Sequence, residues 1–355
     1  MKRTSLLTFT ALLATLLGSA GLMLSQNAAA PGSGKGKAGQ KASDLPYKGK
    51  IEKIKVHGKS LEGNLEGDSA DRDVFIYLPP SYGSQPNRRY PVVYFLHGYG
   101  IGAEAYWNNM LVPQSSDAAQ AAGGKEMILV HPDAFTVHNG SMYSNSPTTG
   151  DWETFVAEEL VAYVDSHYRT VANRASRGLA GHSMGGYGAF RIGMKFPQVF
   201  SSLYPMSSCC LSNNPNSGLG GAVTANSKGK AGGGTTPALA AAWSSNPNNP
   251  PTYYDLPVQD GEYKPEIGAK WYANSPLAMV DQYWTNLKKY KAIKMDIGLQ
   301  DTLLNGNRDM DALLTKLGVT HAYETYEGDH TNRVRERFEK SVLPFFSSNL
   351  DFPAR

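Results

Sequence analysis

The sequence contains very little cysteine. Only two of its 355 residues are cysteines, and they are neighbours, Cys209 and Cys210. Two cysteines cannot form a disulfide framework, and neighbouring cysteines lack the ligand spacing of a structural zinc site. We interpret the pair as small buried hydrophobic residues, with a strained disulfide between them as the alternative.

A large excess of charge of either sign is also absent. The formal net charge is +3, from 34 Lys and Arg against 31 Asp and Glu residues. This balance gives no indication of a nucleic-acid partner. The glycine-rich stretches lack the Lys-Ser/Thr of a phosphate-binding loop. We therefore expect no nucleotide, no other cofactor and no bound metal ion.

The first 48 residues differ in composition from the rest. Residues 1–30 have the parts of a secretory signal, with two basic residues, an apolar run over 6–24 and three alanines at the end. We expect cleavage after Ala30, with an uncleaved membrane anchor as the alternative. Residues 31–48 are rich in Gly, Ser, Lys and Ala, which predicts a flexible linker. The mature protein is then expected to be secreted or periplasmic, without stable insertion into a membrane.

From residue 49 onward, strand patterns alternate with helix patterns. The expected strands are 51–56, 73–78, 90–96, 127–133, 177–180, 200–206, 292–298 and 322–326. The expected helices are 153–165, 187–196, 279–290, 308–317 and 331–346, with Asp151 as a possible N-cap of the first. The first two strands predict an antiparallel start, and the remainder predicts a mostly parallel sheet covered by helices on both faces. Residues 49–355 are thus expected to form one α/β catalytic domain.

A polar segment at about 211–265 interrupts this alternation. It is rich in Asn, Gly, Ser, Lys and Pro, with one short alanine-rich piece at 238–243. We expect either an insertion over the active site or a mobile loop. In the first case, aromatic side chains around the pocket would contact the substrate. The candidates are Trp107, Tyr143 and Trp271.

The most informative stretch is Gly181-His182-Ser183-Met184-Gly185. Its G-x-S-x-G spacing, between a predicted strand and a predicted helix, is typical of a serine nucleophile on a sharp strand-to-helix turn. Glycine fits at both ends because a side chain there would collide with the neighbouring strand or helix. A glycine-rich turn around a hydrogen-bonded serine is the alternative, and the strand–turn–helix context favours the nucleophile.

A serine nucleophile needs a histidine base, and the histidine needs an acid that fixes its tautomer. On a parallel sheet these groups follow strand ends in the chain order serine, acid, histidine. His330 follows the last predicted strand, whereas His321 precedes it. Asp301 comes just after the preceding strand, whereas Asp296 lies within that strand. The expected triad is therefore Ser183, Asp301 and His330.

The tetrahedral intermediate of acyl transfer carries an oxyanion, which two backbone N–H groups can bind. One is expected from Met184, directly after the nucleophile, and the other from the loop 97–100 after the strand 90–96. The histidines beside these donors, His97 and His182, are expected to support the loop and the turn rather than to act as bases.

Several motifs along the chain together resemble one family. They are Val74-Phe-Ile-Tyr-Leu-Pro-Pro, Leu96-His-Gly-Tyr-Gly, Tyr143-Ser-Asn-Ser, Gly181-His-Ser-Met-Gly-Gly, Gly298-Leu-Gln-Asp and Gly328-Asp-His-Thr. The chain resembles, over about residues 49–348, the esterase D-like α/β hydrolases, which include feruloyl and acetyl esterases, S-formylglutathione hydrolases and secreted mycolyltransferases. The resemblance implies an α/β-hydrolase fold, the same triad, and Tyr99 and Met184 as oxyanion donors. The polar segment 211–265 is longer than these compact esterases usually carry.

The sequence therefore predicts a secreted serine esterase that hydrolyses carboxylic esters through an acyl-enzyme, similar to feruloyl or acetyl esterases. Its expected partner is a small-molecule or carbohydrate-linked ester. One alternative is an acyltransferase of the mycolyltransferase type, which passes the acyl group to a sugar hydroxyl. The other is a catalytically inactive hydrolase-fold protein that serves in binding.

Overall fold

The computed structural model describes residues 45–212 and 234–353. The predicted signal segment, most of the predicted linker and part of the predicted insertion lie outside these residues. None of the helices in the described part of the chain has the length and apolar character that crossing a bilayer requires.

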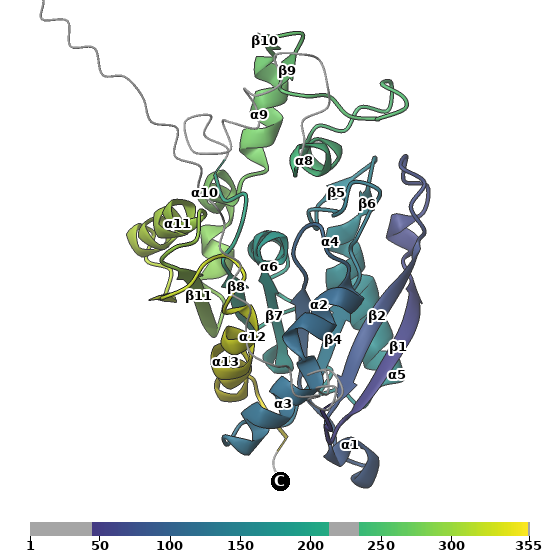
Figure 1. Cartoon of the computed structure of the whole chain (residues 1–355), viewed down its shortest axis with the longest axis vertical. Coiled ribbons are helices and arrows are strands. Elements are labelled where there is room, and N and C mark those ends of the chain that lie inside the picture. The colour runs from purple at the N-terminus through teal and green to yellow at the C-terminus, as the bar shows by residue number, and fades with distance from the viewer. Residues whose placement is uncertain (1–44, 213–233, 354–355) are drawn as a thin grey trace, which may run out of the picture. The chain divides into compact units, whose positions relative to one another are not determined.

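An eight-stranded sheet forms the centre of the described chain, in the order β1-β2-β4-β3-β7-β8-β11-β12 (Figure 1). Its strands are β1 (Lys50–His57), β2 (Asp71–Leu78), β3 (Val92–Leu96), β4 (Ile128–Pro132), β7 (Arg177–His182), β8 (Ser202–Met206), β11 (Ala292–Gly298) and β12 (Ala322–Tyr326). The β1–β2 and β2–β4 pairs are antiparallel, and all later pairs are parallel. This confirms the predicted antiparallel start and parallel remainder.

The central strand β3 is buried on both faces. Its five residues are at most 1% exposed. Because successive side chains of a strand point to opposite faces, Val92, Tyr94 and Leu96 enter one core and Val93 and Phe95 the other. A strand covered on both sides can be apolar at every position, which explains its continuous hydrophobic run.

Helices cover each face of the sheet (Figure 1). One core receives side chains from α2 (Ala103–Met110), α3 (Val112–Ala121), α12 (Val334–Arg337) and α13 (Leu343–Asn349). The other receives them from α5 (Leu160–His167), α6 (Met184–Lys195), α8 (Thr236–Trp243), α9 (Pro265–Ala273), α10 (Pro276–Leu287) and α11 (Leu304–Lys316). Shorter elements are α1 (Ser81–Ser84), α4 (Trp152–Thr154), β5 (Asn145–Ser146), β6 (Gly150–Asp151), β9 (Val258–Gln259) and β10 (Glu262–Tyr263).

Several helix ends differ from the prediction. Asp151 precedes α4, but its side chain makes no capping hydrogen bond. The helix expected at 308 begins at Leu304, since Asn and Gly residues of low helix propensity obscured its first turn. The last helix begins at Val334 rather than 331, because Asp329 accepts hydrogen bonds from the next backbone N–H groups and holds them in a turn.

The described part of the polar segment is packed rather than loose. Its alanine-rich piece forms α8, where residues 238–242 are at most 6% exposed. The Ser146 hydroxyl donates a hydrogen bond to the Ala241 carbonyl oxygen, and the Thr148 hydroxyl donates one to that of Tyr253. At the residues that the structure describes, the segment therefore contributes to the core, unlike the mobile loop that was one of the two alternatives.

The two cysteines are buried and their thiols are free. This confirms their interpretation as buried small residues. Burial raises the pKa of the Cys209 thiol well above its ordinary value, so the thiol stays protonated. The structure has no disulfide between Cys209 and Cys210, so the alternative of a strained disulfide is wrong.

Candidate active site

Ser183 lies alone between β7, which ends at His182, and α6, which begins at Met184. Its backbone has φ 59° and ψ −114°, a conformation that a residue with a side chain adopts only under constraint. The Ser183 N–H donates to the Met206 carbonyl oxygen at 3.0 Å, and its own carbonyl accepts from Tyr187 N–H at 3.0 Å. These bonds fix the serine at the carboxyl edge of the sheet.

The two glycines of the motif are required by close backbone contacts. A Cβ atom on Gly185 would lie 1.9 Å from the Leu96 carbonyl oxygen, and one on Gly181 would lie 2.3 Å from that of Gly185. Real Cβ atoms do not approach so closely. The steric reason expected from the sequence therefore applies at both positions.

The structure brings the three predicted triad residues together. The Ser183 Oγ lies 2.8 Å from His330 Nε2, and His330 Nδ1 lies 2.8 Å from Asp301 Oδ2. Asp301 follows β11 and His330 follows β12, and both strands run parallel to β7. Parallel strands end at the same edge of a sheet, so residues distant in sequence meet there.

Burial and hydrogen bonding define the protonation of the pair. The Asp301 side chain is fully buried, whereas that of His330 is 32% exposed. Burial disfavours the charged carboxylate, but hydrogen bonds from His330 and the Leu303 N–H outweigh it and hold the pKa of Asp301 below its ordinary value. A charged Asp301 accepts the Nδ1 proton, which leaves His330 Nε2 as the acceptor for the serine hydroxyl.

The rejected candidates have other partners. Asp296 is buried within β11, where it accepts hydrogen bonds from Arg337 Nε at 2.8 Å and the Tyr204 hydroxyl at 2.9 Å. His321 Nε2 lies 2.9 Å from Asp311 Oδ1. Asp296 and His321 therefore have structural partners away from Ser183, which accounts for their positions without a catalytic role.

His182 supports the loop of His330. Its Nε2 lies 2.8 Å from the His330 carbonyl oxygen, and the two rings are 4.8 Å apart. Burial, followed by the neighbouring His330, lowers the pKa of His182 to about 3. The ring is therefore neutral and donates its Nε2 proton to that carbonyl. His97 is similarly engaged, with Nε2 accepting from the Ala134 N–H at 2.8 Å.

The two predicted oxyanion donors flank Ser183. Met184 is the first residue of α6, so its N–H has no acceptor within the helix. Tyr99 lies in the loop after β3, and a Cβ on the preceding Gly98 would lie 3.6 Å from Ser183 Cβ. The Tyr99 hydroxyl donates to the Gly234 carbonyl oxygen at 2.8 Å, which ties this loop to the polar segment.

A pocket of about 360 Å³ opens beside Ser183 and His330. It lies between α2 with its preceding loop on one side and residues 330–335 on the other. Its apolar lining residues are Ile101, Tyr106, Met110 and Val334. Besides Ser183, His330 and His182, its polar lining residues are Tyr99, Asn109, Thr331, Asn332 and Arg335. The sequence did not indicate that these two sides form one pocket, because α2 and α12 are more than two hundred residues apart in the chain.

The three aromatic residues expected to contact substrate do not line this pocket. Trp107 and Trp271 are each 3% exposed, and Tyr143 is fully buried. The Tyr143 hydroxyl donates to the His97 carbonyl oxygen at 3.2 Å, and Trp271 Nε1 donates to Ser244 Oγ at 2.9 Å. Their positions near catalytic loops were predicted, but their side chains turn into the core, where large aromatic rings bury the most surface.

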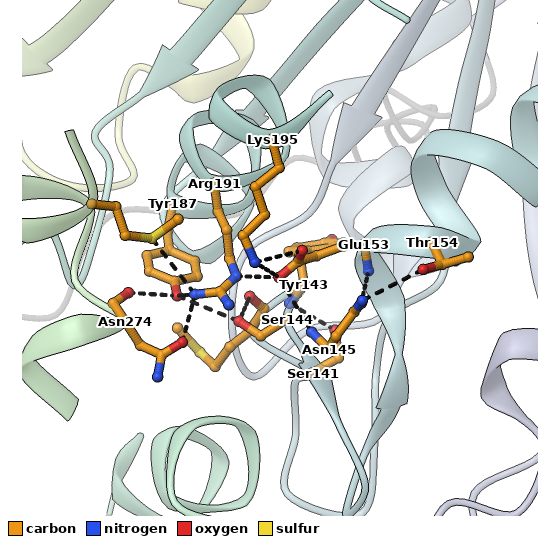
Figure 2. A network of polar contacts seen from close by, with 12 residues as sticks. Ser141, Tyr143, Ser144, Asn145, Glu153, Thr154, Tyr187, Arg191, Lys195 and Asn274 are labelled. Atoms are coloured by element: carbon orange, nitrogen blue, oxygen red, sulfur yellow. Dashed lines mark hydrogen bonds and ion pairs between the residues drawn. The ribbon is translucent and has the colours of Figure 1, made fainter. Parts of the chain in front are cut away.

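A buried ion-pair network that sequence analysis missed lies on the far side of α6 (Figure 2). Arg191 of α6 contacts Glu153 of α4 through Nε at 2.5 Å and Asn274 Oδ1 through Nη1 at 2.8 Å. Lys195 adds a second bond to Glu153 at 2.8 Å. The network connects the helix that carries Ser183 to α4 and to the residues between α9 and α10.

Within residues 45–212 and 234–353, no group of three or more His, Cys, Asp and Glu residues is arranged to hold a metal ion.

Comparison with known proteins identifies a family and structures of similar fold. The family model described as "Putative esterase" matches residues 69–342. Esterase Rv1288 of Mycobacterium tuberculosis is 32% identical over 133 residues, which is 36% of this chain and only 27% of that relative. A ferulic acid esterase structure superposes with a TM-score of 0.63 at 23% identity, covering 86% of this chain and 100% of the other. An S-formylglutathione hydrolase from Agrobacterium tumefaciens has a TM-score of 0.59 at 15% identity, covering 87% and 98%.

The two solved structures share the fold at low identity, and the matched residues 69–342 run from β2 through α12 and include Ser183, Asp301 and His330. This chain belongs to the esterase family that the model describes.

Proposed function

We propose that this protein is a serine esterase that hydrolyses carboxylic esters through an acyl-enzyme at Ser183. The observation that carries the proposal is the unbroken hydrogen-bond chain from Ser183 Oγ through His330 to Asp301, with 2.8 Å at each step. An acid-oriented imidazole in contact with a serine hydroxyl is the arrangement that makes serine nucleophilic.

In the first half-reaction, Ser183 Oγ attacks the ester carbonyl carbon while His330 Nε2 takes the hydroxyl proton. The carbonyl oxygen becomes an oxyanion that the N–H groups of Met184 and Tyr99 bind. Asp301 stabilises the imidazolium but keeps its negative charge. The tetrahedral intermediate then collapses, the alcohol leaves with the proton from His330, and the acyl group stays on Ser183.

In the second half-reaction, His330 takes a proton from water and the resulting hydroxide attacks the acyl carbonyl. Collapse releases the carboxylic acid and returns the proton to Ser183. His182 keeps its place throughout, because its neutral ring holds the His330 carbonyl and leaves Nε2 of His330 directed at the serine.

The substrate we propose is a small-molecule or carbohydrate-linked ester of the feruloyl or acetyl type. The likeness to a ferulic acid esterase and the pocket beside Ser183 support this class. We also propose that the protein acts outside the cytoplasm, on the basis of the signal-like residues 1–30. The catalytic domain would begin at about residue 49, where β1 starts.

The experiment is a panel of p-nitrophenyl esters with methyl ferulate and acetylated xylan, assayed with triad variants. Ser183→Ala and His330→Ala should each lower kcat/KM by roughly 10⁴-fold, and Asp301→Asn should lower it less. The matched control is His321→Gln, since that histidine pairs with Asp311 away from the serine. Retained turnover in Ser183→Ala would remove the proposed nucleophile. Acyl transfer to added trehalose in preference to water would instead identify an acyltransferase.

A further inference from the structure

The pocket beside Ser183 is lined by positive charge without negative charge among the described residues. Among the described residues that line it, none is an Asp or Glu, and Arg335 is the one permanently charged side chain. The opposite wall is mostly apolar, with Ile101, Tyr106 and Met110 beside the amide of Asn109. A ligand in this pocket would therefore meet hydrocarbon on one side and a guanidinium on the other.

The arginines around Arg335 are already engaged. Arg333 Nη1 contacts Glu336 at 2.6 Å, and Arg337 contacts Asp296 and Glu324 at 2.8 and 2.7 Å. Glu336, the nearest acidic residue in sequence, is further occupied by Lys340. Arg335 makes no side-chain hydrogen bond or ion pair with the described residues, so its donors remain available to a ligand.

A guanidinium with free donors prefers a planar or tetrahedral anion. It presents parallel N–H groups that match a carboxylate or phosphate, and such charge-assisted bonds are stronger than neutral ones. Asn109 and Asn332 line the same pocket and can add amide donors.

We propose that Arg335 is a specificity-determining residue that selects esters carrying a negative charge on the part bound in this pocket. This inference rests on the proposed esterase function and adds to it a preference for esters that also carry an anionic group. The apolar wall would hold the hydrocarbon between the ester and the anion. The ester carbonyl would lie at Ser183 and the anionic group at the α12 side of the pocket.

The test uses two isosteric substrate pairs on the full chain. On the acyl side, mono-p-nitrophenyl adipate is compared with p-nitrophenyl hexanoate, which replaces a terminal carboxylate with a methyl group. On the alcohol side, p-acetoxybenzoate is compared with p-acetoxybenzamide. The measured quantity is the ratio of kcat/KM for the anionic ester to that for its neutral partner, so differences in intrinsic reactivity cancel between protein variants.

Because Arg335 is exposed to solvent, in Arg335→Gln this ratio should fall about three- to fivefold for the pair whose anion occupies the pocket. Arg335→Lys should give an intermediate ratio, because it keeps the charge but loses the planar fork. The matched control is Arg333→Gln. It removes an equal charge two residues away from Arg335, from a side chain that already pairs with Glu336.

A fall of less than about twofold on both pairs would overturn the inference. So would an equal fall in Arg333→Gln, because that result reflects net charge rather than a specific contact. A failure of the proposed function is distinguishable, since the wild-type chain would then turn over neither the neutral nor the anionic esters.

Discussion

Ser183 has a backbone conformation that its neighbours impose. With φ at 59°, the residue is held between Gly181 and Gly185, whose missing side chains let α6 approach β3 and β7 closely. The strain raises the hydroxyl above the end of the sheet, where His330 can reach it. At the residue scale, two glycines therefore decide where the proposed nucleophile lies.

Glu66 is a second residue in an unusual state. Both of its carboxyl oxygens are buried without a hydrogen-bond partner among the described residues. Burial, followed by the neighbouring Asp68, raises the pKa of Glu66 to about 9 from an ordinary value of 4.5. The folded protein therefore keeps a proton on Glu66 at pH values where the unfolded chain releases it.

This proton has a predictable effect on stability. Between pH 4.5 and about 9 the folded state binds more protons than the unfolded state, so the contribution of Glu66 to the free energy of unfolding falls as pH rises. Glu66→Gln removes this pH-dependent contribution to the free energy of unfolding. The variant should be more stable than the wild type by about 1–3 kcal/mol at pH 8, with the gain shrinking toward pH 4.5. Urea unfolding at several pH values measures it.

The control for this prediction is Glu266→Gln, an exposed glutamate near the start of α9. Its effect on stability should be small at every pH. A gain from Glu66→Gln that is the same at pH 5 and pH 8 would show that shape, rather than the proton, is responsible.

At the scale of elements, the helix α6 is held from two sides. Ser183 directly precedes its first turn at the sheet edge, and on its far side Arg191 pairs with Glu153 of α4 (Figure 2). Their side chains are only 6% and 3% exposed. A buried ion pair gains little over a hydrophobic pair of equal size, but removal of one partner is costly. Removal of Glu153 takes away the acidic partner of Arg191, and removal of Arg191 leaves Glu153 with Lys195.

Arg191→Met should therefore lower the free energy of unfolding by about 3 kcal/mol, and Glu153→Gln should also be destabilising. The double variant should lose clearly less than the sum of the two, because neither charge is then left buried alone. Urea denaturation of the four proteins in this cycle measures the coupling.

An exposed pair serves as the matched control. Lys340→Met removes a partner of Glu336 at 3.3 Å, and both side chains are exposed. The expected loss is below about 1 kcal/mol. Additive losses for Arg191 and Glu153 would mean that the two residues stabilise the protein independently, and the network would not act as a unit.

At the scale of the whole molecule, the described chain before β1 makes few contacts. The Lys48 N–H donates to Asp117 Oδ2 at 2.6 Å, and Gln114 Nε2 donates to the Leu45 carbonyl oxygen at 2.9 Å, both at exposed sites. By contrast, β1 pairs with β2 over eight residues. The boundary of the catalytic domain is therefore expected at the start of β1.

A chain that begins at Gly49 should fold and hydrolyse esters with kcat/KM within about twofold of the full chain, since exposed terminal contacts contribute little. Its Tm should change by no more than about 5 °C. Thermal unfolding and the ester assay measure both. A chain that begins at Gly58 lacks β1, uncovers the edge of β2, and should lose much more. Equal losses for the two truncations would place the domain boundary earlier in the chain.

Much of the fold could be predicted because its signals are local. The strand expected at 292–298 is β11 with the same bounds, since an apolar run that ends in glycine is readable over seven residues. Helix starts such as Leu304 and Val334 were missed, because turn chemistry and weak helix formers determine them. The alanine-rich piece that forms α8 gave no sign of its complete burial within a polar segment.

The sequence by itself determined the nucleophile turn, the mostly parallel sheet, and the choice of Ser183, Asp301 and His330, which the structure places in hydrogen-bond contact. These follow from glycine sterics within five residues and from the rule that parallel strands end at one edge. Only the tertiary structure decided that Trp107, Tyr143 and Trp271 turn into the core. It also decided that α2 faces Arg335 across a pocket. The direction of a side chain and the pairing of segments distant in the chain depend on packing between elements, which no local pattern encodes.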